Sequence, residues 1–336
     1  MSSGAGVRFS ERHPRLAGFD HRWTAIAPRL EQLETQTRRR RLIADNASGP
    51  LVLFGITALL VGFLLMVLVE PTMLGSYAML FAIILPFLTL WWVHSWKGWP
   101  RREAGELLRS SLFDFLGLQH RRKSRSRMPS TFRRLGLVPI YTGAHTEDHV
   151  TGDIQGVALE FCELVATMWV PGRKTPTEVF RGFLFSLKRS APLNGSIVIS
   201  KGLSPARVVL RWLISSKPLI TLDDEDFDRA FYIRSDLGEA EVRRHLTERL
   251  RGDLLALSAA TDGGVAAAIQ GDRFLLSVRD RRDLFDLSEH DMGFADPQAA
   301  VRLAEGVAIL VDIVERFGET KPKAPGTRAG GGKAAR

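Results

Sequence analysis

The densest group of side chains able to bind a metal ion or transfer a proton lies between residues 145 and 149. His145, Glu147, Asp148 and His149 stand together there. A helical zinc-peptidase site needs His-Glu-x-x-His or the inverted His-x-x-Glu-His. Here the glutamate is displaced by one position, and Gly143 precedes the group, which favours a loop over a helix. We therefore expect a polar loop entering a sheet and no bound metal or cofactor, with His145 and His149 kept as functional candidates.

Glu163 is the third functional candidate. Val157, Leu159 and Phe161 alternate with smaller or polar residues, which is typical of a half-buried strand, and Glu163 continues their face. A buried carboxylate is costly and therefore marks functional sites. The alternative, which we favour, is that a bulge or the strand end exposes Glu163. Cys162 has no base near it in the sequence and is expected to be a small core residue.

No other pattern indicates catalysis. Five acids gather between residues 223 and 228, but the central glycine and terminal glutamate of a calcium loop are absent. We expect a helix start or a solvated turn there. Gly-x-Ser-x-Gly, the nucleophile elbow of many hydrolases, does not occur. The sequence thus identifies no catalytic residue.

Two apolar runs, residues 50–69 and 77–94, are separated by a short linker. About 20 mostly apolar residues are needed to cross the hydrocarbon core of a bilayer. Backbone groups inside lipid must satisfy one another, so each run should be a helix. The sequence predicts an antiparallel transmembrane hairpin within residues 49–96.

Basic residues flank this hairpin, and we treat them as candidate contacts for anionic lipid headgroups. The first cluster precedes the hairpin and the second follows it: Arg38, Arg39, Arg40 and Arg41, then Arg121, Arg122, Lys123, Arg125 and Arg127. By the positive-inside rule both termini lie in the cytoplasm and the chain is a two-pass protein of the inner (plasma) membrane. Each base near an anionic surface is worth about 1 kcal/mol. The alternative is that these charges only set the topology.

The charge is unevenly distributed. The net charge is +9, yet residues 141–318 hold 21 Lys and Arg against 27 Asp and Glu, a net of −6, and the rest carries +15. A basic total suggests nucleic acid, but the region long enough to form a core is acidic. We therefore expect no nucleic-acid partner. The single cysteine excludes an internal disulfide and fits a reducing compartment.

Strand-like and helix-like patterns follow one another beyond residue 140. Residues 157–162 and 181–188 alternate around a loop at 171–176, a predicted antiparallel hairpin. Further elements are expected at these places: a turn at Asn194-Gly195 leading to strand 196–200, a strand at 230–234, a helix from a cap at Asp236 through Leu257, a hairpin turning at Gly271-Asp272, and a last helix beginning at Pro297. This order predicts an α+β fold with a mainly antiparallel sheet.

These elements divide the chain into five predicted segments. They are a cytoplasmic N-terminal segment with an amphipathic helix from Asp20 (1–48), the transmembrane hairpin (49–96), a basic juxtamembrane linker with a helix at 101–118 (97–140), a cytoplasmic α+β domain (141–318) and a disordered basic tail (319–336). The domain of residues 141–318 is the part large enough to carry a function.

Several short stretches resemble a bacterial family of uncharacterised membrane proteins designated DUF3137. They are Glu147 to Gly152 leading to Leu159 to Glu163, Val179 to Gly182, Leu222 to Phe231, and Arg281 to Asp286. The resemblance implies a two-helix membrane anchor with a cytoplasmic domain, and it carries no activity. Where the family often has proline in the first turns of the middle helix, this chain has Thr247.

Together these patterns predict a membrane-anchored cytoplasmic adaptor or sensor that binds a protein partner at the inner membrane face. The bilayer itself, through anionic headgroups, is the second expected partner, and homo-oligomerisation is left open. The alternative is a membrane-associated enzyme acting on a lipid or another membrane-proximal substrate. A pocket containing Glu163 or His145 would favour the enzyme, and a broad exposed apolar patch would favour the adaptor.

Overall fold

A computed structural model describes residues 9–11, 14–68, 73–122, 126–201, 217–261, 264–282, 284–285 and 293–318. The chain divides into two compact units. Unit 1 comprises Met1–Leu112 and Asp286–Glu305, and unit 2 comprises Phe113–Phe285 and Gly306–Arg336. The predicted tail, residues 319–336, lies outside the described residues. The five predicted segments stay predictions.

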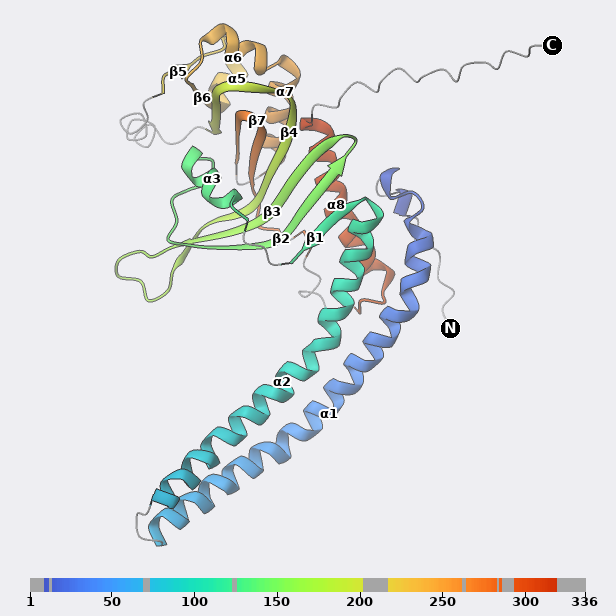
Figure 1. Ribbon diagram of the computed structural model, residues 1–336, viewed down its shortest axis with the longest axis vertical. Coiled ribbons are helices and arrows are strands. Elements are labelled where there is room, and N and C mark those ends of the chain that lie inside the picture. Colours follow the sequence, from blue (N-terminus) through green and yellow to red (C-terminus); the bar gives the residue numbers. More distant parts are fainter. Residues whose placement is uncertain are drawn as a thin grey trace, which may run out of the picture. The chain divides into compact units, whose positions relative to one another are not determined.

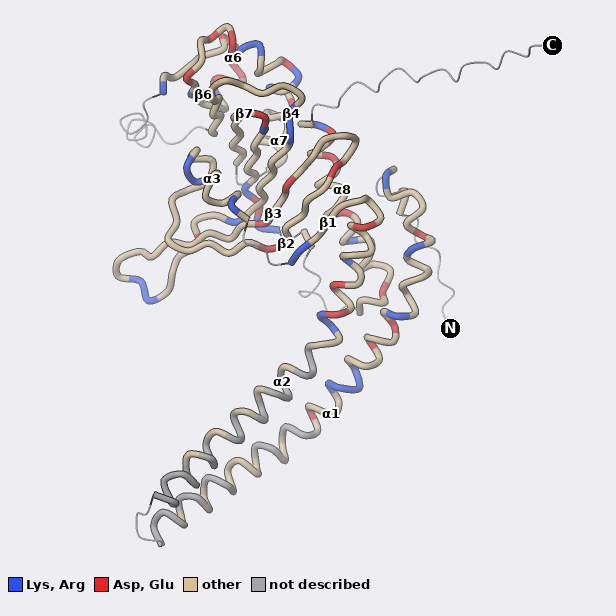
Figure 2. The backbone as a smooth tube through the Cα atoms, in the orientation of Figure 1, with Lys and Arg blue, Asp and Glu red and all other residues tan. Residues whose placement is uncertain are grey.

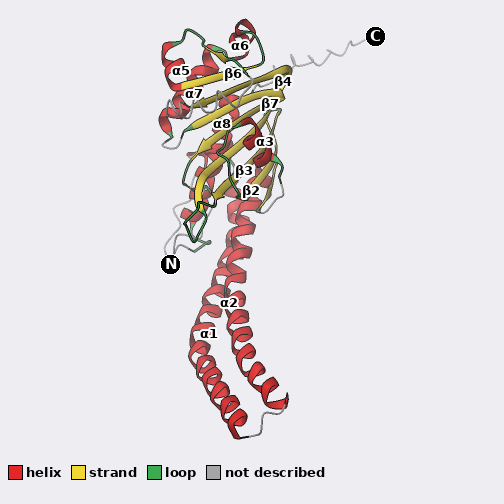
Figure 3. Cartoon of the chain, turned by 90° about the vertical axis from the view of Figure 1, so that its left-hand side faces the viewer, coloured by secondary structure: helices red, strands yellow, loops and turns green. Residues whose placement is uncertain are grey.

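Unit 1 is dominated by two long helices, α1 (Phe19–Leu68) and α2 (Met73–Phe115), which run side by side (Figures 1 and 3). Short 3-10 turns, η1 (Phe9–Glu11) and η2 (Pro14–Leu16), precede them. Arg29 pairs with Glu103 at 3.1 Å, which identifies the helices as antiparallel neighbours. The helices predicted from Asp20 and at 101–118 are confirmed as helical up to Phe115, but they are not separate elements, because each is continuous with an apolar run.

Large apolar side chains of α1 and α2 are exposed at many described positions. They include Leu42, Leu53, Phe54, Ile56, Leu60, Leu64, Leu80, Leu88, Trp91 and Trp99. Across the described part of the chain, no helix combines the length and the apolar character that crossing a membrane requires. The transmembrane hairpin stays a prediction.

Unit 2 is built on a seven-stranded antiparallel sheet in the order β1-β2-β3-β4-β6-β5, with β7 paired to β4. Its strands are β1 (Leu118–Arg121), β2 (Gly143–Ile154), β3 (Val157–Met168), β4 (Thr177–Lys201), β5 (Leu219–Ile220), β6 (Phe231–Ser235) and β7 (Val265–Arg279). The predicted α+β class with a mainly antiparallel sheet is confirmed, as is the β3–β4 hairpin.

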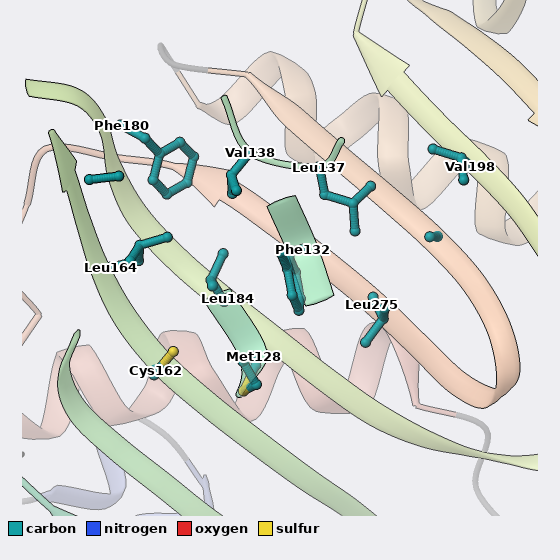
Figure 4. Packing of buried hydrophobic residues seen from close by; sticks show 12 residues of the cluster. Met128, Phe132, Leu137, Val138, Cys162, Leu164, Phe180, Leu184, Val198 and Leu275 are labelled. Atoms are coloured by element: carbon teal, nitrogen blue, oxygen red, sulfur yellow. The ribbon is translucent and has the colours of Figure 1, made fainter. Parts of the chain in front are cut away.

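β7 pairs with both halves of β4 and changes direction within its own length. Gly182 of β4 lies opposite Arg279, whereas Ser200 lies opposite Ala266, so the two ends of β4 pair with opposite ends of β7. The N–H of Arg279 donates to the carbonyl of Gly264 at 2.9 Å, which brings the ends of β7 together. β7 thus folds back on itself, as the bent strand that carries Leu275 shows in Figure 4, and Gly271 near its middle has a left-handed φ of 56°. The predicted turn at Gly271-Asp272 is confirmed.

Each face of the sheet is covered by a helix. Helix α3 (Met128–Leu135) inserts Phe132 into a cluster with Cys162 and Leu275 (Figure 4). Neighbouring residues of a strand point to opposite faces of the sheet. Phe274, next to Leu275, stacks on Phe317 of α8 (Pro297–Phe317), with the ring centroids 5.6 Å apart. The segment of α8 that belongs to unit 2 therefore covers the face opposite α3. Phe161 and Glu163, which flank Cys162, point to that same face.

The middle helix differs from its prediction in two ways. Instead of one helix there are α6 (Glu239–His245) and α7 (Glu248–Ala260), preceded by the short α5 (Glu225–Ala230). The Thr247 hydroxyl accepts the N–H of Leu250 at 3.3 Å and so caps a new helix. Asp236 is not the cap, because its carboxylate accepts the N–H of Ser196 at 2.6 Å instead.

Candidate functional site

The polar residues singled out in β2 do not converge on one point. A register shift between Glu147 and Val150 marks a bulge in the β2–β3 pairing, and Asp148 within it has a left-handed φ of 45°. A bulge turns one side chain away from the strand's alternation. Asp148 is therefore buried, whereas His145 and Glu147 stay near the surface and contact each other, with Nε2 and Oε1 2.8 Å apart.

Asp148 forms a buried pair with His120 of β1. Nε2 of His120 lies 2.7 Å from Oδ1 of Asp148, and the two side chains are only 3% and 8% exposed. The Phe113 ring stacks on the imidazole at 4.9 Å, and the N–H of Asp148 donates to the carbonyl of Arg122. Sequence reasoning missed His120, because no local pattern indicates that β1 pairs with the bulge of β2.

His149 takes a different carboxylate, that of Glu160 in β3. Nε2 of His149 lies 2.9 Å from Oε1 of Glu160, and the Ser126 hydroxyl donates to the same oxygen at 2.7 Å. The hydrogen bond with His149 is the main cause that lowers the pKa of Glu160, against an opposing contribution from burial. Ser126 also accepts the N–H of Met128 at 3.0 Å, so this cluster holds the start of α3 to the sheet.

Glu163 is buried, only 6% exposed, so the favoured interpretation that a bulge or strand end exposes it is wrong. The bulge lies in the partner strand β2 and leaves β3 regular at this residue. The carboxylate accepts the N–H of Leu284 at 3.2 Å. The neighbouring Phe285 ring packs edge-on against Phe113 and Phe161, with centroids 5.4 and 5.8 Å apart. The buried Glu163 carboxylate therefore acts as a hydrogen-bond acceptor for the 284–285 segment.

We define the polar core cluster as His120, Asp148 and Glu163. These side chains tie β1, the β2 bulge, β3 and the 284–285 segment together around three phenylalanine rings. An aspartate–histidine pair resembles the base of many hydrolases, but a general base must reach the proton that it removes. With both side chains almost fully covered, the pair instead stabilises the packing of these segments.

The neighbouring thiol is also unsuited to nucleophilic chemistry. Cys162 is fully buried. Burial, followed by the charges of Glu160 and Glu163, raises the pKa of the Cys162 thiol far above its ordinary value. A thiol held protonated is a poor nucleophile, which agrees with the expected role as a core residue.

The acidic residues between 223 and 228 form the start of a helix, which was one of the two structures predicted for them. Asp224 caps α5 by accepting the N–H of Phe227 at 3.2 Å. Arg243 and Arg251 pair with Asp223 and Asp224, each at 2.6 Å. Among the described residues, no group of three His, Cys, Asp or Glu side chains is arranged to hold a metal ion. Asp223 and Asp224 are thus paired with arginine side chains.

The basic candidates are only partly described. Lys123 and Arg125 lie outside the described residues. Arg121, Arg122 and Arg127 are exposed. Of the first cluster, Arg38 pairs with Glu34 at 2.7 Å, and the Arg40 guanidinium lies 5.6 Å from the ring centroid of Trp99. Their role at lipid headgroups stays a prediction.

One family model matches part of the chain. Residues 178–318 match the family model described as "Protein of unknown function (DUF3137)". The match includes three of the resembling stretches, and the stretches from Glu147 to Glu163 precede it. No curated protein matches the chain.

One solved structure is similar, the crystal structure of the mycobacterial trehalose monomycolate transport factor A, TtfA. The identity is 12% and the TM-score 0.32, and the similarity covers 66% of this chain and 99% of that one. A similarity of this level carries no argument about fold or function.

Proposed function

From the match of residues 178–318 to the DUF3137 family model, we propose that the chain is a membrane-anchored adaptor or sensor. Its helices α1 and α2 insert into the inner membrane as a two-pass hairpin, with both termini in the cytoplasm. Its α+β domain binds a protein partner at the membrane face. The proposal has two parts, the anchor and the adaptor, and each has its own support.

The exposed apolar side chains of α1 and α2 are the observation that carries the anchor. Leu53, Leu60 and Leu64 of α1 and Leu80 and Leu88 of α2 are each more than half exposed. Burying one leucine side chain stabilises by roughly 1.5–3 kcal/mol relative to leaving it in water. Two water-soluble helices would turn these residues toward each other or toward a core. Hydrocarbon is the surrounding that makes this arrangement favourable.

The ends of the apolar runs support the same placement. Arg40 precedes the first run and Trp99 follows the second, and the two side chains lie against each other. Tryptophan and arginine both favour the headgroup level, the first by its amphipathic ring and the second by pairing with phosphates. Arg38, Arg39 and Arg41 are exposed beside them. By the positive-inside rule this level faces the cytoplasm.

The adaptor part is supported by how unit 2 uses its titratable side chains. His120, Asp148 and Glu163 are engaged inside the core, and His149 is engaged with Glu160. Contacts of this kind hold surfaces in place and do not transform a substrate. A domain held at a membrane with its polar chemistry directed inward is suited to presenting a surface to a partner.

The anchor is tested with the full chain expressed in bacteria. Carbonate extraction should leave the wild-type chain in the membrane, and replacing Leu60 and Leu64 by arginine should release it, whereas replacing both by isoleucine should not. An alkaline phosphatase fused after Arg336 should be inactive, because it stays in the cytoplasm. Phosphatase activity from that fusion, or full release of the wild-type chain, contradicts the proposal.

The adaptor is tested by photo-cross-linking in intact membranes. A photoreactive residue is placed at Leu219, an exposed position of edge strand β5, and a matched one at exposed Arg249 of α7. We expect one of the two positions to capture the same polypeptide reproducibly, and a second copy of this chain would identify a homo-oligomer. Absence of any cross-link together with lipid turnover by the purified chain, lost in a variant of the exposed His145, His145→Gln, would establish the enzyme alternative.

A further inference from the structure

The connection between β3 and β4 carries an exposed apolar and basic group at the end of the sheet. Trp169 is 58% exposed and Ile140, on the segment before β2, is 76% exposed. Arg173 and Lys174 at the turn are exposed as well. We call these four residues the basic tip. Trp169, Arg173 and Lys174 belong to the hairpin that projects from the sheet in Figure 1, and its turn is blue in Figure 2.

Hydrogen bonds give the basic tip a defined shape. The N–H of Trp169 donates to the Thr142 hydroxyl at 3.1 Å, and the N–H of Thr142 donates to the carbonyl of Thr167 at 2.9 Å. The segment that carries Ile140 therefore lies beside the hairpin. The N–H of Arg173 closes the turn on the carbonyl of Val170 at 3.1 Å. The apolar and basic side chains are thus presented together.

The positive charge of the basic tip is not neutralised nearby. Residues 169–176 contain no acid. Within the described part of the chain, neither Arg173 nor Lys174 lies at ion-pair distance from a carboxylate, and the Arg173 guanidinium donates to the Thr177 hydroxyl. The first acid beyond the turn, Glu178, is paired with Arg181 at 3.0 Å. Arg133, which lies over the Tyr141 ring at 4.8 Å, adds a further base close by.

We propose that the basic tip is a second membrane contact, in which Trp169 and Ile140 enter the headgroup region and Arg173 and Lys174 pair with anionic lipid. The inference rests on the proposed function, which places the domain at a bilayer. Indole rings favour this interface and bases are attracted to anionic leaflets. A stable protein interface buries about 1,600 Å², more than two apolar side chains at a turn supply. A lipid surface needs no such area.

The test uses the full chain reconstituted into lipid nanodiscs. A single reactive cysteine replaces Thr175, and an environment-sensitive fluorophore is attached there, since Cys162 is fully buried. The matched control carries the label at Asp226, whose side chain is 83% exposed on α5. Retention in the bilayer is measured first. Fluorescence and quenching by lipid-attached nitroxides are then compared in phosphatidylcholine alone and mixed with phosphatidylglycerol.

We expect the label at 175, but not the label at 226, to shift to the blue and be quenched in the anionic bilayer. Trp169→Ser should abolish the shift. Each base near an anionic surface raises the binding constant about fivefold. Arg173→Gln combined with Lys174→Gln should therefore shift the equilibrium between the membrane-bound and the water-exposed basic tip on the order of 30-fold toward the water-exposed state.

Two outcomes overturn the inference while the anchor stands. One is a chain retained in the anionic bilayer whose label at 175 is as water-exposed as the label at 226. The other is a label at 175 that responds to soluble polyglutamate as strongly as to the anionic bilayer, which would assign the tip to an acidic polypeptide. A chain that is not retained in the bilayer contradicts the proposed anchor instead, and the tip is then tested by adding the same vesicles from outside.

Discussion

The carboxylate of Glu163 accepts the backbone N–H of Leu284 at 3.2 Å, across 121 residues of sequence. This hydrogen bond joins the centre of β3 to a segment outside the sheet. Phe285, the next residue, is fully buried and packs between Phe113 and Phe161. A single acceptor thus helps to position an aromatic core residue.

Replacing Glu163 by alanine should destabilise the fold. The N–H of the half-buried Leu284 loses its acceptor, and an unsatisfied donor costs up to about 1–3 kcal/mol when it is fully buried. Glu163→Gln keeps an acceptor oxygen and should cost less. Denaturant unfolding of the detergent-purified chain measures the free energies, and hydrogen exchange at Leu284 should accelerate in the alanine variant. Equal stability of the two variants would contradict this role.

Asp148 combines a buried hydrogen bond with a left-handed backbone. Asp148→Ala removes the partner of His120. It also leaves alanine, which has no polar side chain to form a local hydrogen bond, at a φ of 45°. We therefore expect the free energy of unfolding to fall by about 3 kcal/mol or more. Asp148→Asn keeps an acceptor and tolerates this backbone region, so its loss should be about 1 kcal/mol. Asp148→Gly relieves the backbone only. An alanine variant as stable as wild type would contradict a stabilising role for the pair with His120.

The Glu160 carboxylate should make stability depend on acid pH. Its pKa is lowered from the ordinary value of 4.5, chiefly by the hydrogen bond with His149. The unfolded chain then binds a proton more readily than the folded one, so stability rises with pH in this range. The contribution is complete above about pH 4.5 and is lost as the pH falls through the lower folded pKa. Melting temperatures of wild type and Glu160→Gln, compared across this range, should converge at low pH.

Two glycines should respond to alanine in opposite directions. A Cβ on Gly182 of β4 would overlap the carbonyl oxygen of Val278 in β7, and such overpacking costs about 1–3 kcal/mol. Gly252 lies in α7 with nothing within 4 Å of the added atom, so Gly252→Ala should stabilise by roughly 0.5–1 kcal/mol. Thermal unfolding measures both. An unchanged melting temperature of the Gly182→Ala variant would contradict the close contact between β4 and β7.

Much of the secondary structure of unit 2 was predictable. Alternation around Phe161 and Phe183 predicted the β3–β4 hairpin, and glycine chemistry at Gly271 predicted the turn of β7. The break in the middle helix was harder to predict, because a threonine such as Thr247 is compatible both with the interior of a helix and with the cap of a new one. Only its hydrogen bond to Leu250 distinguishes the two.

The candidate site was less predictable than the fold. His145 and His149 stood out by their spacing, yet each takes its own carboxylate partner. Glu163 was identified as a candidate, but its burial was not favoured. His120 was missed, because a single histidine in a short strand carries no signal of its own.

The sequence by itself determined the elements: the periodicity of the strands, the last helix, the two apolar runs and the separation of basic flanks from an acidic domain. These are local properties of neighbouring side chains, so they can be read along the chain. Only the tertiary structure decided that His120 meets Asp148 and that Glu163 meets Leu284. Those contacts depend on strand register, on one bulge and on segments 28 and 121 residues apart, and no local pattern specifies such pairings.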